Sequence, residues 1–107
     1  MPDEDKKQAA HRALVDRVLT AEGKASTEQR ARAFNNEGLS PPLDALVAKI
    51  SDAPAQVTEA DLASAKACGC TEDKLFELVV CAAVGQSTRL YEAGLAALAE
   101  ARSDHAT

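Results

Sequence analysis

The sequence predicts an all-α protein of about five helices, and both its composition and its punctuation support this. Alanine accounts for 23 of the 107 residues and aromatic residues for only 3%. Alanine loses no side-chain entropy in a helix, so such a composition favours helices. The length allows a single domain. We expect one helical domain over residues 8–102, between polar tails, 1–7 and 103–107, that we expect to be disordered.

The first half of the chain predicts three short helices. The first, over residues 9–21, has a moderate apolar stripe with a period of 3.6 residues. The second begins at a cap, Ser26 or Thr27, and ends in the segment 35–38, Asn-Asn-Glu-Gly, which tolerates left-handed backbone. The third begins at a Ser-Pro-Pro motif, where we expect Ser40 to cap.

The fourth predicted helix runs from Glu59 to Cys68 and is closed by Gly69. It begins with Thr58, followed three residues later by Asp61. This spacing is typical of a capping box, with Asp in place of Glu.

The fifth predicted helix is long, from Thr71 to about Arg102, and is apolar nearly all round between Leu75 and Val84. A helix of this kind is buried on most sides. Four short helices cannot cover all of its apolar surface, so we expect a neighbouring subunit to cover the rest and the protein to be a homo-oligomer. Small residues such as Gly85 and Gly94 would let helices approach closely.

The composition also excludes several classes of partner. The net charge of −5 argues against nucleic-acid binding and against anionic membrane surfaces. No segment is long and apolar enough to span a membrane, and the charged first residues do not resemble a secretory signal. Three cysteines, an odd number, argue against a disulfide framework. We therefore expect a cytoplasmic protein, with no cofactor implied.

The order of elements in residues 39–98 resembles a known family. A proline-started helix, a connector and a short alanine-rich helix ending in Gly69 lead to Thr71-Glu72-Asp73-Lys74-Leu75-Phe76-Glu77-Leu78-Val79. This pattern is similar to the carboxymuconolactone decarboxylase-like and alkylhydroperoxidase-like superfamily. The resemblance implies a small all-helical subunit of alkylhydroperoxidase-like architecture that assembles into oligomers.

The resemblance also implies where the catalytic residues of the family would lie. Its peroxidase branch uses Cys-x-x-Cys-x-x-x-His, with the histidine eight residues before the glycine that ends the short helix. Counted back from Gly69, these positions are Pro54, Val57 and Asp61. Because a peroxidatic site needs a reactive thiolate, we expect no peroxidase chemistry at the usual site.

The decarboxylase branch of the family keeps the histidine and often an acid one turn before it. Here Asp61 replaces the histidine, and Glu59 lies near the place of the acid. A buried carboxylate can act as an acid or base, but a capping role for Asp61 is the preferred interpretation. Arg89 can bind an anionic substrate, although an ion pair with Glu92, Glu77 or Asp61 is the preferred interpretation.

The remaining candidates are cysteines and histidines. Cys68 and Cys70 flank one glycine; they can form a strained redox disulfide, and a helix start can lower the pKa of Cys70. The preferred interpretation is that both are small turn residues and that Cys81 belongs to the core. We expect no metal site, because the possible ligands are too few, and we expect His11 to face solvent. Tyr91 is expected to pack. Four arginines are expected to form a solvated basic face: Arg12, Arg17, Arg30 and Arg32.

Two kinds of function follow. The first is an oligomeric helical protein of this superfamily, non-catalytic or of unknown activity, that acts as a structural or interaction module. The alternative is a small-molecule enzyme, decarboxylase-like or thiol redox, with a displaced site at Glu59, Asp61 and Arg89 or at Cys68 and Cys70. The alternative predicts that Arg89 and a carboxylate converge on a cavity of ligand size.

Overall fold

The computed structural model describes residues 2–106, and the side chains of residues 6–103. In this part of the chain there are five α-helices, one 3-10 turn and no strand, which confirms the predicted all-α class. The elements in chain order are α1 (Pro2–Thr20), α2 (Thr27–Asn35), α3 (Leu43–Asp52), η1 (Pro54–Gln56), α4 (Glu59–Ala67) and α5 (Glu72–Ala106).

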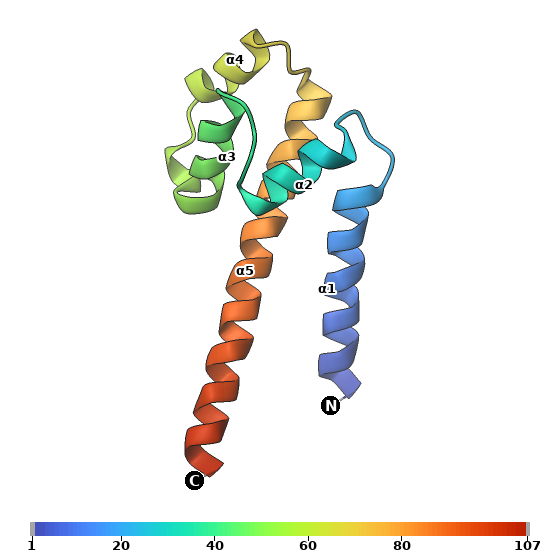
Figure 1. The fold of residues 1–107 in the computed structure, drawn as a ribbon, viewed down its shortest axis with the longest axis vertical. Helices are drawn as coiled ribbons and strands as arrows, with labels where there is room; N and C mark the ends of the chain where they lie inside the picture. The colour runs from blue at the N-terminus through green and yellow to red at the C-terminus, as the bar shows by residue number, and fades with distance from the viewer. Residues whose placement is uncertain (1, 107) are drawn as a thin grey trace.

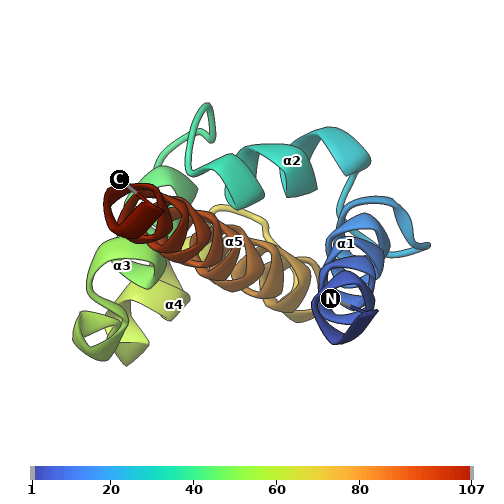
Figure 2. The same cartoon turned by 90° about the horizontal axis from the view of Figure 1, so that it is seen from below.

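Helix α5 is the axis of the structure. Helices α2, α3 and α4 gather around its first half, and α1 runs beside it in the opposite direction (Figure 1). The second half of α5 and the first half of α1 project together from this head, and the molecule measures 57 × 28 × 21 Å. Figure 2 shows α2 on one side of α5 and no helix directly opposite it.

Most of the predicted helix ends are confirmed by their hydrogen bonds. Ser26 accepts from the Gln29 amide at the start of α2, and Asn36 ends that helix with a φ of 52°. Thr58 and Asp61 form the predicted capping box of α4. Thr71 accepts from the Lys74 amide at the start of α5.

The predicted cap of α3 is wrong. The residue at the N-cap position of α3 is Pro42, and no side chain accepts a hydrogen bond there. The backbone carbonyl of Ser40 instead accepts from the amide of Leu43 at 3.0 Å. The two prolines separate the Ser40 side chain from the first turn of the helix.

The core lies where α2, α3 and α4 meet α5. It consists of buried alanines and larger apolar side chains: Ala25, Ala33, Leu43, Leu46, Val47, Ala65, Leu75, Leu78, Cys81 and Ala82. No aromatic residue is among them, and Phe34 is only partly buried at the edge. The core is therefore small, and all of its α5 members come from the first third of that helix.

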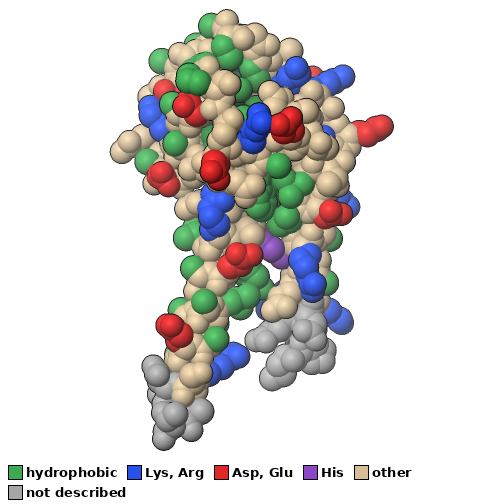
Figure 3. All heavy atoms as spheres, in the orientation of Figure 1, with side chains coloured by type: hydrophobic (Ala, Val, Ile, Leu, Met, Phe, Trp, Pro, Cys, Tyr) green, Lys and Arg blue, Asp and Glu red, His purple; other side chains and the backbone are tan. Residues whose placement is uncertain are grey.

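Several large apolar side chains lie outside this core. They are all on α1 and α5, with the following exposed fractions: Leu14 47%, Phe76 70%, Leu90 64%, Leu95 39% and Leu98 54%. On α5 every residue from 92 to 103 is exposed. Figure 3 shows hydrophobic side chains gathered between the two projecting helices.

Helix α1 is joined to α5 by a contact around His11. The His11 ring lies 3.0 Å from the Thr88 hydroxyl (Nε2 to Oγ1) and stacks on Tyr91, with the ring centroids 4.9 Å apart. The expectation that His11 faces solvent is therefore wrong. The packing role of Tyr91 is confirmed, and its partner is His11.

The expected tails continue the two projecting helices. Residues 2–7 belong to α1 and residues 103–106 belong to α5, while the side chains of residues 1–5 and 104–107 lie outside the described part. Disorder of these ends in solution stays a prediction.

Helices α2 and α5 approach most closely at Gly85. A Cβ at this position would lie 1.9 Å from the Phe34 carbonyl oxygen. At Gly94, by contrast, a Cβ would have no neighbouring atom within 4 Å. Of the two small residues predicted to allow close approach, Gly85 does so within the chain and Gly94 does not.

We predict opposite effects of alanine at these two glycines. Gly85→Ala should lower the free energy of unfolding by about 1–3 kcal/mol, because the end of α2 must move away from α5. Gly94→Ala should raise it by up to about 1 kcal/mol, because alanine is the better helix former and meets no neighbour within the chain. Urea denaturation followed by circular dichroism measures both, and equal effects would contradict the close contact at Gly85.

Candidate functional site

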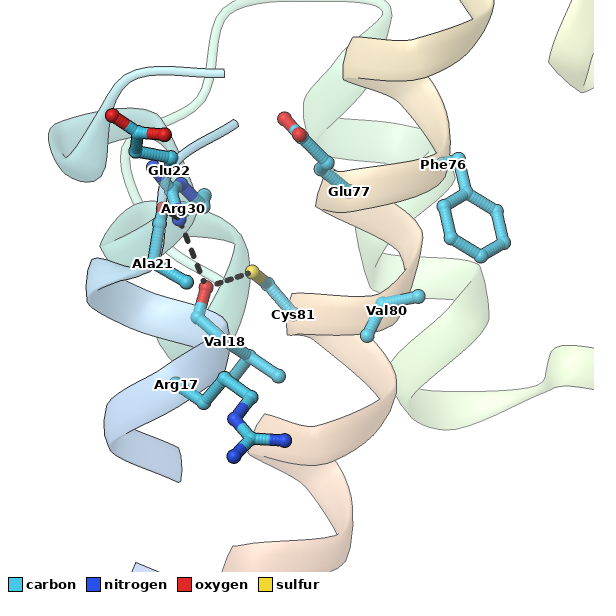
Figure 4. Close-up of a pocket in the computed structure, with 9 residues that line it drawn as sticks. All are labelled: Arg17, Val18, Ala21, Glu22, Arg30, Phe76, Glu77, Val80 and Cys81. Atoms are coloured by element: carbon cyan, nitrogen blue, oxygen red, sulfur yellow. Dashed lines mark hydrogen bonds between the residues drawn. The ribbon is translucent and has the colours of Figure 1, made fainter. Parts of the chain in front are cut away.

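A hollow of about 180 Å³ lies between the end of α1 and the first half of α5 (Figure 4). Its lining combines apolar and charged side chains: Arg17, Val18, Ala21, Glu22, Arg30, Phe76, Glu77, Val80 and Cys81. The loop between α1 and α2, residues 21–26, lies at one end of it. Its lining thus brings two arginines and two glutamates together at one hollow.

Arg30 holds the end of α1. Its side chain donates from Nε to the Ala25 carbonyl (3.2 Å) and from Nη1 to the carbonyls of Val18 (3.5 Å) and Ala21. The last carbonyls of a helix have no partner within the helix, so a guanidinium with several donors satisfies them well. Arg30 is only 6% exposed. The expectation that it belongs to a solvated basic face is therefore wrong.

Glu77 holds the same loop from the other side. Its carboxylate accepts from the amides of Lys24 (2.8 Å) and Ala25 (2.6 Å). The hydrogen bonds from Ala25 and then Lys24 lower the pKa of Glu77 below its ordinary 4.5, and the nearby charge of Arg30 lowers it further. Glu77 is therefore an anion that binds amide groups, and at neutral pH it carries no proton to donate.

Cys81 completes the contact between α5 and α1. Its thiol donates to the Val18 carbonyl at 3.4 Å, and the side chain is buried. Burial raises the pKa of Cys81, so this sulfur is a thiol and not a thiolate at neutral pH. The prediction that Cys81 belongs to the core is confirmed.

Three of the side chains that line this hollow are thus committed to backbone partners. Arg30, Glu77 and Cys81 together satisfy backbone groups of Val18, Ala21, Lys24 and Ala25. Cys81 lacks the thiolate that a nucleophile needs, and Glu77 lacks the proton that a general acid needs. The arrangement shapes the loop between α1 and α2, and this is a structural role.

The structure separates the predicted catalytic carboxylates from Arg89. Asp61 accepts from the Thr58 amide (Oδ2 to N, 2.9 Å) and pairs with Lys49 (Oδ2 to Nζ, 3.0 Å). These bonds, the Thr58 amide first and then Lys49, lower its pKa. Glu59 is exposed in the first turn of α4. The preferred capping role of Asp61 is confirmed.

Arg89 also binds the end of a helix. Its Nη1 donates to the Phe34 carbonyl at 2.8 Å, and its other nitrogens donate to the Gln86 side chain. The expected ion pair with Glu92, Glu77 or Asp61 is wrong, because the ion pairs of the described residues do not include Arg89. The Phe34 carbonyl is free at the end of α2, which makes it a better partner.

Cys68 and Cys70 lie in the turn between α4 and α5, as the preferred interpretation has it. Cys68 is exposed and its thiol donates to the Ala65 carbonyl at 3.0 Å, while Cys70 is half-buried. Both thiols are free. Burial, and then the proximity of Cys68, raises the pKa of Cys70. This is opposite to the lowering expected from a helix start.

Three further hollows are shallow or lie on loops. One of about 440 Å³ lies between α4 and α5. Two charged residues in its lining, Lys66 and Glu72, form a salt bridge with an Nζ to Oε1 distance of 2.7 Å. Another lies beside Gly38 and α3, and a third lies along the loop 20–24. Neither Glu59, Asp61 nor Arg89 lines any of these four hollows.

The described residues hold neither a metal-binding cluster nor a helix that could cross a membrane. No group of three or more histidine, cysteine, aspartate or glutamate side chains lies close enough there to hold a metal ion. Among the same residues, no helix combines the length and the apolar character that a membrane crossing requires.

The described residues thus form an all-α fold in which Arg30 and Glu77 make a cluster of hydrogen bonds to the loop between α1 and α2. Compared with protein-family models, with curated proteins and with solved structures, the chain matches none of them.

We predict that Arg30 contributes strongly to stability and that its neighbour Arg32 does not. Arg30→Met should lower the free energy of unfolding by about 2–4 kcal/mol, because it leaves the carbonyls of Ala21 and Ala25 without their side-chain donor. Arg32→Met removes only an exposed pair with Glu28, one turn apart, and should cost less than about 0.5 kcal/mol. Chemical denaturation distinguishes the two, and similar losses would contradict the buried role of Arg30.

We also predict a pH dependence of stability that comes from Glu77. Because its pKa is lowered by folding, its contribution is complete above pH 4.5 and is lost as the pH falls from there through the folded pKa. Glu77→Gln should be less stable than the parent at neutral pH, and the difference should shrink on acidification. Melting temperatures between neutral pH and pH 3 measure this, and a constant difference would contradict it.

Proposed function

We propose that this chain is a non-catalytic, self-associating helical subunit, a structural or interaction module related to the carboxymuconolactone decarboxylase-like superfamily. One observation carries the proposal. The large apolar side chains that the core does not cover are confined to α1 and α5, and Phe76 and Leu90 are more exposed than buried.

The pattern of exposure supports self-association. A soluble monomer tolerates single exposed apolar residues, but a gathered set marks an interaction surface. Here five such residues share two adjacent helices that project from the head. The 35 residues of α5 extend over about 52 Å, well beyond the head that covers its first half.

The chemistry of the charged residues supports a non-catalytic role. Asp61 caps α4, Glu77 binds two amides, and Arg30 binds carbonyls at the end of α1. At the positions of the family motif, Val57 packs against the core and Pro54 begins the turn η1. These residues therefore have structural roles within the monomer.

The alternative, a small-molecule enzyme with a displaced site, has less support. It needs Arg89 and a carboxylate at one cavity, and Arg89 donates to Phe34 while Asp61 pairs with Lys49. The thiol redox version of this alternative needs a thiol with a low pKa, and the pKa of Cys70 is raised.

We also propose that the protein is cytoplasmic, because a reducing compartment suits its three free thiols.

We predict that the purified chain associates reversibly. Sedimentation equilibrium over a wide dilution series should give an apparent mass that rises with concentration, because burial of the apolar face drives association. Reduced and oxidised samples should behave alike, which excludes a disulfide as the cause. A mass that stays at the monomer value throughout would contradict the proposal.

A further inference from the structure

The uncovered side of α5 carries a regular repeat. Counted from Phe76, uncharged residues recur at alternating intervals of four and three: Phe76, Val80, Ala83, Ser87, Leu90, Gly94, Ala97 and Ala101. We call this set the α5 stripe. The alternation gives a mean spacing of 3.5 residues, the period with which two helices pack along their length.

The α5 stripe is open to solvent along its length. Seven of its eight members are exposed and Val80 is half-buried. It lies between α1 and α4, because Phe76 lines both the hollow shared with α1 and the hollow shared with α4. In Figure 4 the Phe76 ring points away from α1. A second helix can therefore lie along the stripe without displacing an element of the same chain.

We propose that the α5 stripe of one copy packs antiparallel against the α5 stripe of a second copy, about a two-fold axis near the middle of the stripe. This inference deepens the proposed self-association and rests on it. A two-fold axis requires each position to face its counterpart on the partner helix, so the sequence of the stripe must be complementary to its own reverse.

The sizes of the side chains meet this requirement. When the stripe is laid against its reverse, every large residue faces a small one: Phe76 faces Ala101, Val80 faces Ala97, Leu90 faces Ser87, and Ala83 faces Gly94. Alternation of large and small residues fills each layer without overpacking. A parallel pair would instead place Phe76 on Phe76 and Gly94 on Gly94. The interface would then be crowded at the phenylalanines and would have a void at the glycines.

The polar member of the stripe fits a buried place. The Ser87 hydroxyl donates to the Ala83 carbonyl of its own helix at 2.9 Å, so it needs no partner across the interface. The flanking positions also bring no like charges together. On the flank of the stripe that carries Glu77, the residue of the second copy nearest to Glu77 is Leu98. On the other flank, the residue nearest to Glu100 is Val79.

The area decides the strength of the pairing. The stripe spans 26 residues, about 39 Å, and a strip about 10 Å wide gives about 400 Å² on each copy. A standard stable interface takes about 800 Å² from each partner. Leu14, one turn before Arg17 and Val18 on the same side of α1, adds to the rim. We therefore expect a dimer that dissociates on dilution.

Cysteine cross-linking tests the register directly. In a Cys68→Ser, Cys70→Ser background, chains carrying Ala83→Cys and chains carrying Gly94→Cys, distinguished by mass, are mixed and mildly oxidised. The proposal predicts disulfides between the two kinds of chain and few within either kind alone. Ala96→Cys, exposed on the other side of α5, serves as the control and should cross-link with neither. Cross-linking of Ala83→Cys with itself would indicate a parallel pair and overturn the proposal.

A charge substitution gives an independent readout. Leu90→Glu should raise the dissociation constant of the dimer at least about tenfold, because the carboxylate would be buried against Ser87 of the second copy. Ala96→Glu, with the same charge on the other side of the helix, should leave it unchanged. Both sites are exposed in the monomer, and circular dichroism should show the parent helix content.

The outcomes separate the two proposals. If the parent chain sediments as a monomer at every concentration, self-association itself is wrong. If the parent dimerises but Leu90→Glu has no effect or the mixed disulfide does not form, the register is wrong and self-association stands.

Discussion

Backbone groups at the ends of α1 and α2 have no partners within their own helices, and the rest of the structure depends on how side chains from elsewhere satisfy them. Arg30 takes carbonyls at the end of α1, and Glu77 takes two amides of the loop that follows. Arg89 takes the Phe34 carbonyl at the end of α2. Because Glu77 and Arg89 are both on α5, these bonds fix where α1 and α2 lie along it. The same carbonyl of Phe34 lies against Gly85, one turn before Arg89, so the space and the donor for this contact come from neighbouring positions of one helix face.

The parts of the fold that could be predicted from the sequence are those that local rules control. Thr58 with Asp61, Ser26 and Thr71 mark helix starts by interactions within four residues; the sequence predicts the first and the last, and for the second it leaves Ser26 and Thr27 open. Arg30 and Arg32 look alike in the sequence, and only the position of α1 in space makes one buried and the other exposed. Glu77 did give a signal, as the only acid within the apolar run from Leu75 to Val84. Its partners, however, are more than fifty residues away, so its role could not be read locally.

The candidate site was harder to predict than the fold for the same reason. A carboxylate, a guanidinium and a thiol are the groups from which active sites are made, and they are also the groups that satisfy orphan amides and carbonyls. Asp61 was assigned correctly because capping is local. Arg89 was expected to find an acid, and it found a carbonyl instead.

The contact between His11 and Thr88 has a chemical consequence for the two projecting helices. The Thr88 hydroxyl donates its single proton to the Val84 carbonyl at 2.7 Å. It can only accept from His11, so the hydrogen of a neutral His11 ring must be on Nε2 and the lone pair on Nδ1. The ring itself lies stacked on Tyr91, so the hydrogen bond and the stacking both hold the imidazole in one orientation. The link between α1 and α5 therefore selects one tautomer of its histidine.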